Sequence, residues 1–91
     1  MKFMVIEHFK NRDPAPVYAR LAERGRMLPD GVQYLGSWVE PNYDRCFQLM
    51  EAPDQSALER WAQNWSDLVS FEFVPVLDSA TAARSSGEPV S

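Results

Sequence analysis

The chain is poor in the residues that build covalent or metal-bound scaffolds. It has one cysteine and one histidine among 91 residues. A single cysteine cannot close an internal disulfide, which excludes a disulfide-stapled secreted scaffold. A cysteine-based zinc site and a multi-histidine site both need more ligands than these two residues supply. We therefore expect no metal and no cofactor.

Positive charge and long apolar runs are also scarce. Nine Lys and Arg residues stand against 13 Asp and Glu residues, which gives a net charge of −4. An acidic chain is a poor electrostatic match for nucleic acid. No apolar run approaches the roughly 20 residues of a membrane-spanning helix, and segment 1–7 breaks too early for a signal peptide. We expect a cytoplasmic protein that binds neither nucleic acid nor membrane.

What is present is the patterning of one small α+β domain. Segments rich in β-branched and aromatic residues predict four strands, at 2–9, 32–39, 44–52 and 70–76. Apolar residues at helical spacing predict a first helix that is capped by Asp13 and ends before Pro29. They predict a second helix that begins after Asp54. The element order is therefore β-α-β-β-α-β.

This order predicts a ferredoxin-like fold, in which a four-stranded antiparallel sheet carries both helices on one face. We expect the domain to occupy residues 1–80. Residues 79–84 have the composition of one or two helical turns. Residues 81–91 are expected to form a polar C-terminal tail without fixed structure.

The face that each strand side chain takes depends on the strand register. Pairing Val5 with Phe47 and Trp38 with Cys46 divides the strand residues into a helix-covered set and an open-face set. The covered set is Phe3, Val5, Leu35, Ser37, Val39, Phe47 and Leu49, with Glu7 and Arg45 as an ion pair at its margin. The open-face set is Met4, Ile6, His8, Tyr34, Gly36, Trp38, Cys46, Gln48 and Met50. A slip by one residue would exchange the two sets on the slipped strand.

The open-face set is too apolar to remain in water. It would expose on the order of several hundred Å², which is at or beyond the largest patch typical of a soluble monomer. Covering that patch at roughly 25 cal/mol per Å² favours association. The simplest solution is a homodimer that packs sheet against sheet. Its core would combine apolar walls with a few polar groups, which suits a small organic ligand.

Four segments carry a resemblance to a known family. They are residues 1–9, 31–38, 45–52 and 61–68. The layout resembles the dimeric α/β-barrel superfamily, and the chain is similar to an uncharacterised bacterial domain-of-unknown-function family within it. That superfamily includes cofactor-independent monooxygenases, isomerases and ligand-sensing domains, which use a cavity between sheet and helices or at the dimer core. Its members share no catalytic set, so the resemblance implies a dimer and a cavity and assigns no residue a role.

Three functions remain open from the sequence. The first is a small homodimeric protein that binds a small organic molecule, with Tyr34, Trp38 and Gln48 lining the pocket. The second is a monooxygenase- or isomerase-like enzyme without a cofactor, in which His8 shuttles a proton. The third is a structural protein-interaction module whose open face binds a different protein.

Other residues with chemical potential have a structural interpretation. Trp61 and Trp65 lie one helical turn apart and are expected to pack in the core. Cys46 is expected to be a small buried apolar residue rather than a nucleophile. Three arginines of the first helix are interpreted as a solvated basic face: Arg20, Arg24 and Arg26.

Overall fold

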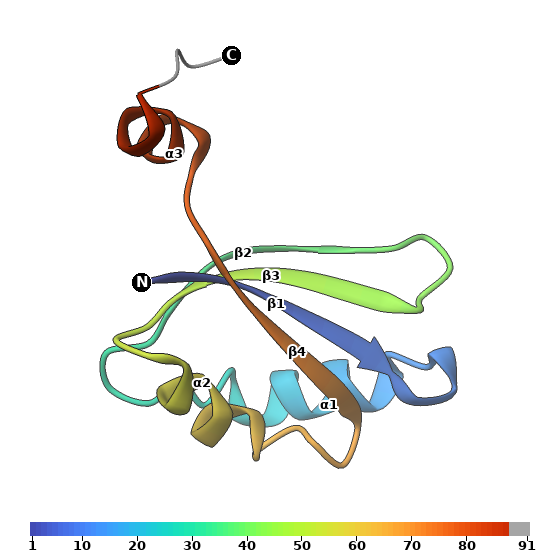
Figure 1. Ribbon diagram of the computed structural model, residues 1–91. Helices are drawn as coiled ribbons and strands as arrows, with labels where there is room; N and C mark the ends of the chain where they lie inside the picture. The colour runs from blue at the N-terminus through green and yellow to red at the C-terminus, as the bar shows by residue number, and fades with distance from the viewer. Residues whose placement is uncertain (88–91) are drawn as a thin grey trace.

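Strands and helices follow one another in the predicted order, and a further helix is added at the end (Figure 1). Figure 1 shows the chain as a computed structural model, which describes residues 1–87. The elements are β1 (Lys2–Phe9), a 3-10 turn (Lys10–Arg12), α1 (Ala15–Arg24), β2 (Gln33–Val39), β3 (Arg45–Glu51), α2 (Gln55–Ala62), β4 (Val69–Val76) and α3 (Ser79–Ser86). The strands form one antiparallel sheet in the order β2-β3-β1-β4. The α+β class and the four-stranded sheet are therefore confirmed.

Helices α1 and α2 lie on the same side of the sheet, and α3 lies beyond its other side (Figure 1). The core fills the space between the sheet and the first two helices. Its largest fully buried side chains are Phe3, Val5, Met50, Leu58 and Val69. Helix α2 contributes four buried residues to this core, whereas α1 contributes none.

Both predicted helix starts have a carboxylate that accepts a backbone amide. Asp54 caps α2 and accepts from the Ala57 amide at 2.9 Å. Asp13 accepts from the Ala15 amide, the first residue of α1, at 3.0 Å. These short side chains satisfy donors that a helix leaves free in its first turn.

Helix α1 is shorter than predicted. It ends at Arg24 instead of continuing toward Pro29, because Gly25 adopts a φ of 67° and donates its amide to the Leu21 carbonyl at 2.8 Å. Glycine takes this conformation without the steric cost that a Cβ brings. Arg26 therefore lies in a loop and not on the helix.

The predicted register of the central strands is wrong by one residue. Val5 pairs with Gln48, not with Phe47. Trp38 pairs with Phe47, not with Cys46. Since neighbouring side chains point to opposite faces, this slip reverses the whole of β3.

The reversal changes the membership of both faces. Cys46, Gln48 and Met50 are buried under the helices, whereas Phe47 and Leu49 lie on the open face. The open face remains apolar, because Met4, Ile6 and Val74 occupy neighbouring positions on β1 and β4. It also carries Trp38, which is 61% exposed.

A β-bulge in β2 explains why Tyr34 is not on the open face. Tyr34 pairs with Met50 and Gly36 pairs with Leu49, so Leu35 is an extra residue between them. An extra residue shifts the alternation of side chains by one. Tyr34 and Ser37, three positions apart, consequently share the covered face, where their hydroxyl oxygens lie 2.6 Å apart.

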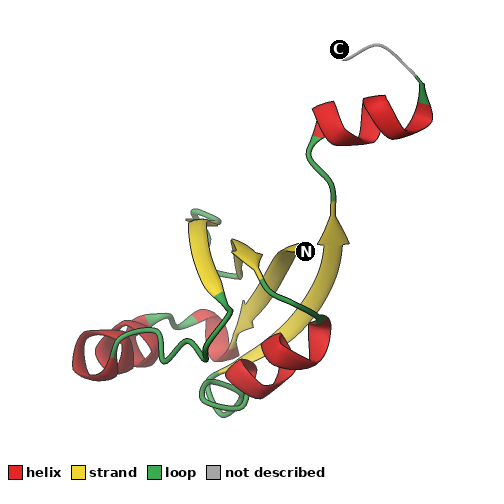
Figure 2. Ribbon diagram, turned by 90° about the vertical axis from the view of Figure 1, so that its left-hand side faces the viewer, coloured by secondary structure: helices red, strands yellow, loops and turns green. Residues whose placement is uncertain are grey.

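Helix α3 stands apart from the rest of the molecule (Figures 1 and 2). Asp78 caps it by accepting from the Thr81 amide at 2.8 Å, and Gly87 ends it in the left-handed conformation. None of its residues is buried. The one or two helical turns expected at 79–84 are thus confirmed as part of α3, whereas the prediction of a tail without fixed structure from residue 81 is wrong for 81–86. The remaining tail residues 88–91 lie outside the described part of the chain. No helix within residues 1–87 is long and apolar enough to cross a bilayer.

Candidate functional site

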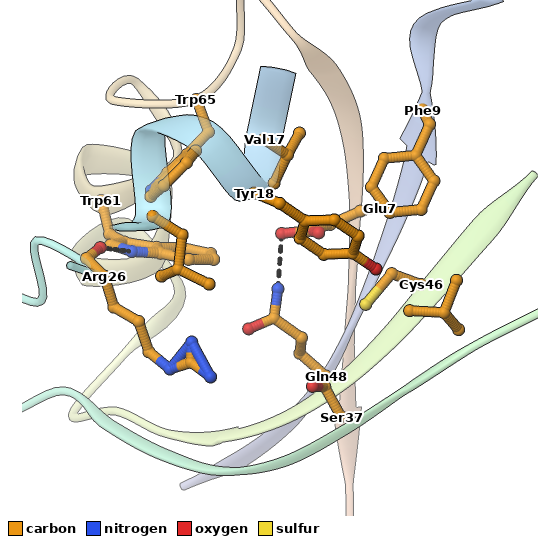
Figure 3. A pocket seen from close by; sticks show the side chains of 12 residues that line it. Glu7, Phe9, Val17, Tyr18, Arg26, Ser37, Cys46, Gln48, Trp61 and Trp65 are labelled. Atoms are coloured by element: carbon orange, nitrogen blue, oxygen red, sulfur yellow. Dashed lines mark hydrogen bonds between the residues drawn. The ribbon is translucent and has the colours of Figure 1, made fainter. Parts of the chain in front are cut away.

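A pocket of about 190 Å³ lies on the covered face, where α1, the loop after it, α2 and the strands meet (Figure 3). Its walls are apolar and aromatic: Phe9, Val17, Leu21, Val39, Trp61 and Trp65. Its polar groups are Glu7, Arg26, Ser37 and Gln48, and Tyr18 and Cys46 complete the lining. Apolar walls with a few convergent polar groups are typical of small-molecule sites.

A hydrogen-bonded pair of polar side chains lies against the sheet in this pocket. Glu7 and Gln48 are only 5% and 8% exposed, and the Gln48 amide nitrogen donates to the Glu7 carboxyl at 2.5 Å (Figure 3). Burial raises the pKa of Glu7 to about 7, although the charge of Arg26 and the Gln48 hydrogen bond both act to lower it. Near neutral pH this carboxyl can therefore either accept or release a proton.

The strand pattern explains how a carboxyl comes to be buried here. Glu7 lies on the same face of β1 as Phe3, Val5 and Phe9, all of which are buried. Because these three apolar side chains face the helices, Glu7, which alternates with them along the strand, faces the helices too. An ionised carboxylate at such a position costs desolvation energy, and the raised pKa reflects this cost.

The thiol and the phenol of the pocket wall stay neutral at neutral pH. Burial, followed by the nearby Glu7, raises the pKa of the Cys46 thiol to about 12. The same two kinds of effect raise the pKa of Tyr18, with burial the larger. A thiol with so high a pKa carries almost no thiolate at neutral pH. The prediction that Cys46 is a small buried residue is confirmed. Glu7 and Arg26 are the pocket residues that carry charge.

The arginines do not form the predicted solvated face. Arg20 makes two hydrogen bonds to the Asp67 carboxylate, both at 2.7 Å, and a third to the Asn64 carbonyl at 2.9 Å. It thereby ties α1 to the segment between α2 and β4. Arg26 lies over the Tyr34 ring, with its guanidinium carbon 3.5 Å from the ring centroid. Only Arg24 keeps the predicted exposed position.

The residues that the sequence proposed for the site are divided between the two faces. Gln48 lines the pocket, and Tyr34 lies beside it under Arg26. Trp38 and His8 lie on the open face, away from the pocket lining. The ion pair expected between Glu7 and Arg45 is absent, because Arg45 pairs with Glu40 at 2.8 Å.

Sequence reasoning did not find Glu7 or Arg26 as pocket residues. The covered side of β1 was predicted correctly from Phe3 and Val5, but the register error paired Glu7 with Arg45 at the margin of that face instead of with Gln48 inside it. The signal for Arg26 was the preceding Gly25, since glycine is the residue that most often ends a helix. Among residues 1–87, no group of three or more His, Cys, Asp and Glu side chains is arranged to hold a metal ion.

Comparison with known families gives one match. The model of a family described as a domain of unknown function, DUF3303, matches residues 1–88. The chain belongs to the DUF3303 family. No curated protein and no solved structure matches it significantly. Membership in DUF3303 covers nearly the whole chain and assigns it no activity or ligand.

Proposed function

We propose that this DUF3303 domain binds a small organic molecule in the pocket beneath α1. The observation that carries the proposal is the buried Glu7–Gln48 pair inside a cavity whose other walls are largely apolar. A carboxyl with a strongly raised pKa in a pocket is a feature that functional sites share. The pocket is also the place where α1 leaves the core unfilled, since α1 buries none of its residues completely.

The size of the pocket limits what it holds. A cavity of about 150 Å³ is sufficient for benzene. The volume of about 190 Å³ therefore suits a single-ring or branched aliphatic compound with one small polar group. The tryptophans Trp61 and Trp65 supply flat walls for such a ring.

A pair of variants on one helix tests this location. Val17 lines the pocket, whereas Ala22 is exposed on the same helix. We expect Val17→Phe to fill the pocket and abolish binding of single-ring aromatic probes, and Ala22→Phe to leave binding unchanged. Chemical-shift changes in ¹H–¹⁵N spectra report both the binding and the integrity of the fold. Equal binding by the folded V17F variant would contradict the proposal.

We further propose that a second copy of the chain covers the open face, which would give the dimeric barrel arrangement. An exposed Trp38 beside Phe47 and Leu49 is an apolar surface that water solvates poorly. Helix α3 offers a second argument. It has eight residues, buries none of them and stands apart from the sheet, although helices this short are marginal in water without packing. A two-fold related copy covers the face and supplies α3 with a packing partner in one symmetric contact.

The molar mass of the protein in solution tests the proposed dimer. Phe47→Asp places a charge at the centre of the open face and is expected to convert a dimer into a monomer, as measured by light scattering. Tyr43→Asp is the matched control, because Tyr43 is an aromatic residue of the β2–β3 turn that is 52% exposed. A wild-type chain that remains monomeric would overturn this proposal and favour a module that binds a different protein.

The enzyme hypothesis based on His8 finds no comparable support. It required His8 to share a cavity with Tyr34 and Gln48. His8 lies on the open face, opposite Arg45 in the sheet, and the pocket lies on the other face.

A further inference from the structure

The guanidinium of Arg26 is held in place by an aromatic ring, and its charge acts on the nearby Glu7 carboxyl without a direct contact. Its guanidinium lies over the Tyr34 ring at 3.5 Å, and within residues 1–87 it forms no ion pair and donates no hydrogen bond. It belongs to the pocket lining, and Figure 3 shows its side chain reaching to the same side of the pocket as Gln48. A guanidinium has five N–H donors in a planar fork that matches a carboxylate.

Both ends of this side chain are fixed by neighbouring groups. The Arg26 carbonyl accepts a hydrogen bond from the Trp61 indole at 2.8 Å, which anchors the backbone to α2. The Tyr34 hydroxyl lies 2.6 Å from the Ser37 hydroxyl, which fixes the ring beneath the guanidinium. The bulge at Leu35 is what brings these two hydroxyls to the same face. A binding group whose position is set in advance loses less entropy when a ligand arrives.

From this geometry we propose, resting on the proposed function above, that the ligand is a compact monocarboxylic acid with an apolar body. Its carboxylate pairs with the free guanidinium of Arg26, and its body packs between the indole rings and the aliphatic wall. An ion pair of this kind in a largely apolar pocket is stronger than the same pair in water.

The pocket holds a second carboxyl, and its charge decides the pH dependence of binding. Glu7 and a ligand carboxylate repel each other when both are ionised. The pKa of Glu7 lies at about 7, because burial outweighs the attraction of Arg26. A ligand that neutralises Arg26 removes that attraction, so Glu7 takes up a proton when an anion binds.

Other groups around Glu7 do not compete for this role. Cys46 on β3 stays a neutral thiol, and Tyr18 on α1 stays a neutral phenol. Helix α2 presents the Trp61 indole, the turn after α2 presents the Trp65 indole, and β4 presents Phe71 opposite Glu7. Proton uptake on binding is therefore assigned to Glu7.

Three compounds of the same shape test the charge of the ligand. Benzoate is an anion, benzamide is neutral and benzamidine is a cation. At pH 6 we expect benzoate to bind about tenfold to a hundredfold more tightly than benzamide, as measured by calorimetry. Arg26→Gln should remove this preference, so that benzoate binds no more tightly than benzamide. Arg24→Gln is the matched control, since Arg24 is exposed on the same segment.

The pH dependence provides a second readout that a purely structural role of Arg26 would not produce. With a Glu7 pKa of about 7, the benzoate affinity should fall about tenfold between pH 6 and pH 8. In Glu7→Gln it should stay constant over that range. Calorimetry in buffers of different ionisation enthalpy counts the proton that the wild-type complex takes up.

Each other outcome overturns a defined part of the argument. Equal affinity for benzoate and benzamide would disprove the anion site and keep the binding function. Preference for benzamidine would make Glu7 the anchor in place of Arg26. Failure of all three compounds to bind would contradict the binding function as well.

Discussion

The two helices on the covered face differ in how many buried residues they contribute to the core. Helix α2 inserts four buried residues into the core. Helix α1 inserts none, is held to its surroundings by Arg20, and leaves a pocket of about 190 Å³ beneath it. The difference indicates that α2 contributes more to the stability of the core and that α1 forms one wall of the pocket. The same substitution should therefore have different effects under the two helices.

Leucine truncation should show the largest difference. Leu58 on α2 is fully buried, and Leu58→Ala should lower the free energy of unfolding by about 4 kcal/mol. Leu21 on α1 is partly exposed beside the pocket, and Leu21→Ala should cost only about 1 kcal/mol. Urea unfolding measures both. Equal losses would mean that α1 belongs to the core as fully as α2.

Glu7 should make the pocket half of the core pH-sensitive. Its pKa is about 7 in the folded chain and 4.5 as its ordinary value, so the folded state holds the proton more strongly. Stability therefore falls as pH rises from about 4.5 to 7 and stays low above that. Glu7→Gln should raise the free energy of unfolding by about 3 kcal/mol at pH 8 and leave it nearly unchanged at pH 4.

The control for this prediction is Glu72→Gln, because Glu72 is an exposed carboxylate of β4. Its unfolding free energy should follow the wild-type pH profile. A Glu7→Gln variant that gains no stability at pH 8 would show that the buried carboxyl is fully compensated in its ionised form.

Replacing each of the two tryptophans by Phe should give a smaller difference in the free energy of unfolding. Trp61 donates its indole N–H to the Arg26 carbonyl at 2.8 Å, whereas the buried indole N–H of Trp65 has no acceptor within residues 1–87. Trp61→Phe loses a hydrogen bond, whereas Trp65→Phe removes a buried N–H donor that had no acceptor. We expect Trp61→Phe to destabilise the chain by about 1 kcal/mol more than Trp65→Phe, as measured by urea unfolding. The reverse order would contradict this assignment of the two indoles.

The ion pair that holds α1 should have the smallest effect. Arg20 keeps the pKa of Asp67 at about 2, so the stabilisation is present above pH 4 and is lost as pH falls through 2. Both groups are solvated, and such pairs contribute little. Asp67→Asn should lower Tm slightly at pH 7 and not at pH 2. Glu23→Gln, whose partner Arg24 is 3.8 Å away, should leave Tm unchanged at both pH values.

The order of the elements could be predicted because its signals are local. Asp54 and Asp13 indicate helix starts because their carboxylates can accept first-turn amides. The β-branched segments indicate strands whatever their position in the sheet. The register could not be predicted in the same way. The covered side of β1, with Phe3 and Val5, was predicted correctly, but alternation within each strand does not specify which residue of β3 lies opposite Val5.

The predicted location of the site residues depended on the register of β3. Because β3 carries Phe47 and Leu49 on one side and Met50 and Cys46 on the other, a shift of one residue looked equally favourable. The predicted register placed Gln48 on the open face and predicted an ion pair between Glu7 and Arg45. The extra residue Leu35 in β2 determines where Tyr34 points, and its one sequence signal is the isolated Gly36 that follows it.

The outer strands of the sheet have a consequence for how copies of the chain meet. Strand β2 carries the bulge at Leu35, and strand β4 carries Pro75, which has no amide hydrogen to donate. Each irregularity interrupts the row of backbone groups that a neighbouring strand would need. Growth of the sheet into ribbon-like fibrils by strand addition at either edge is thereby disfavoured.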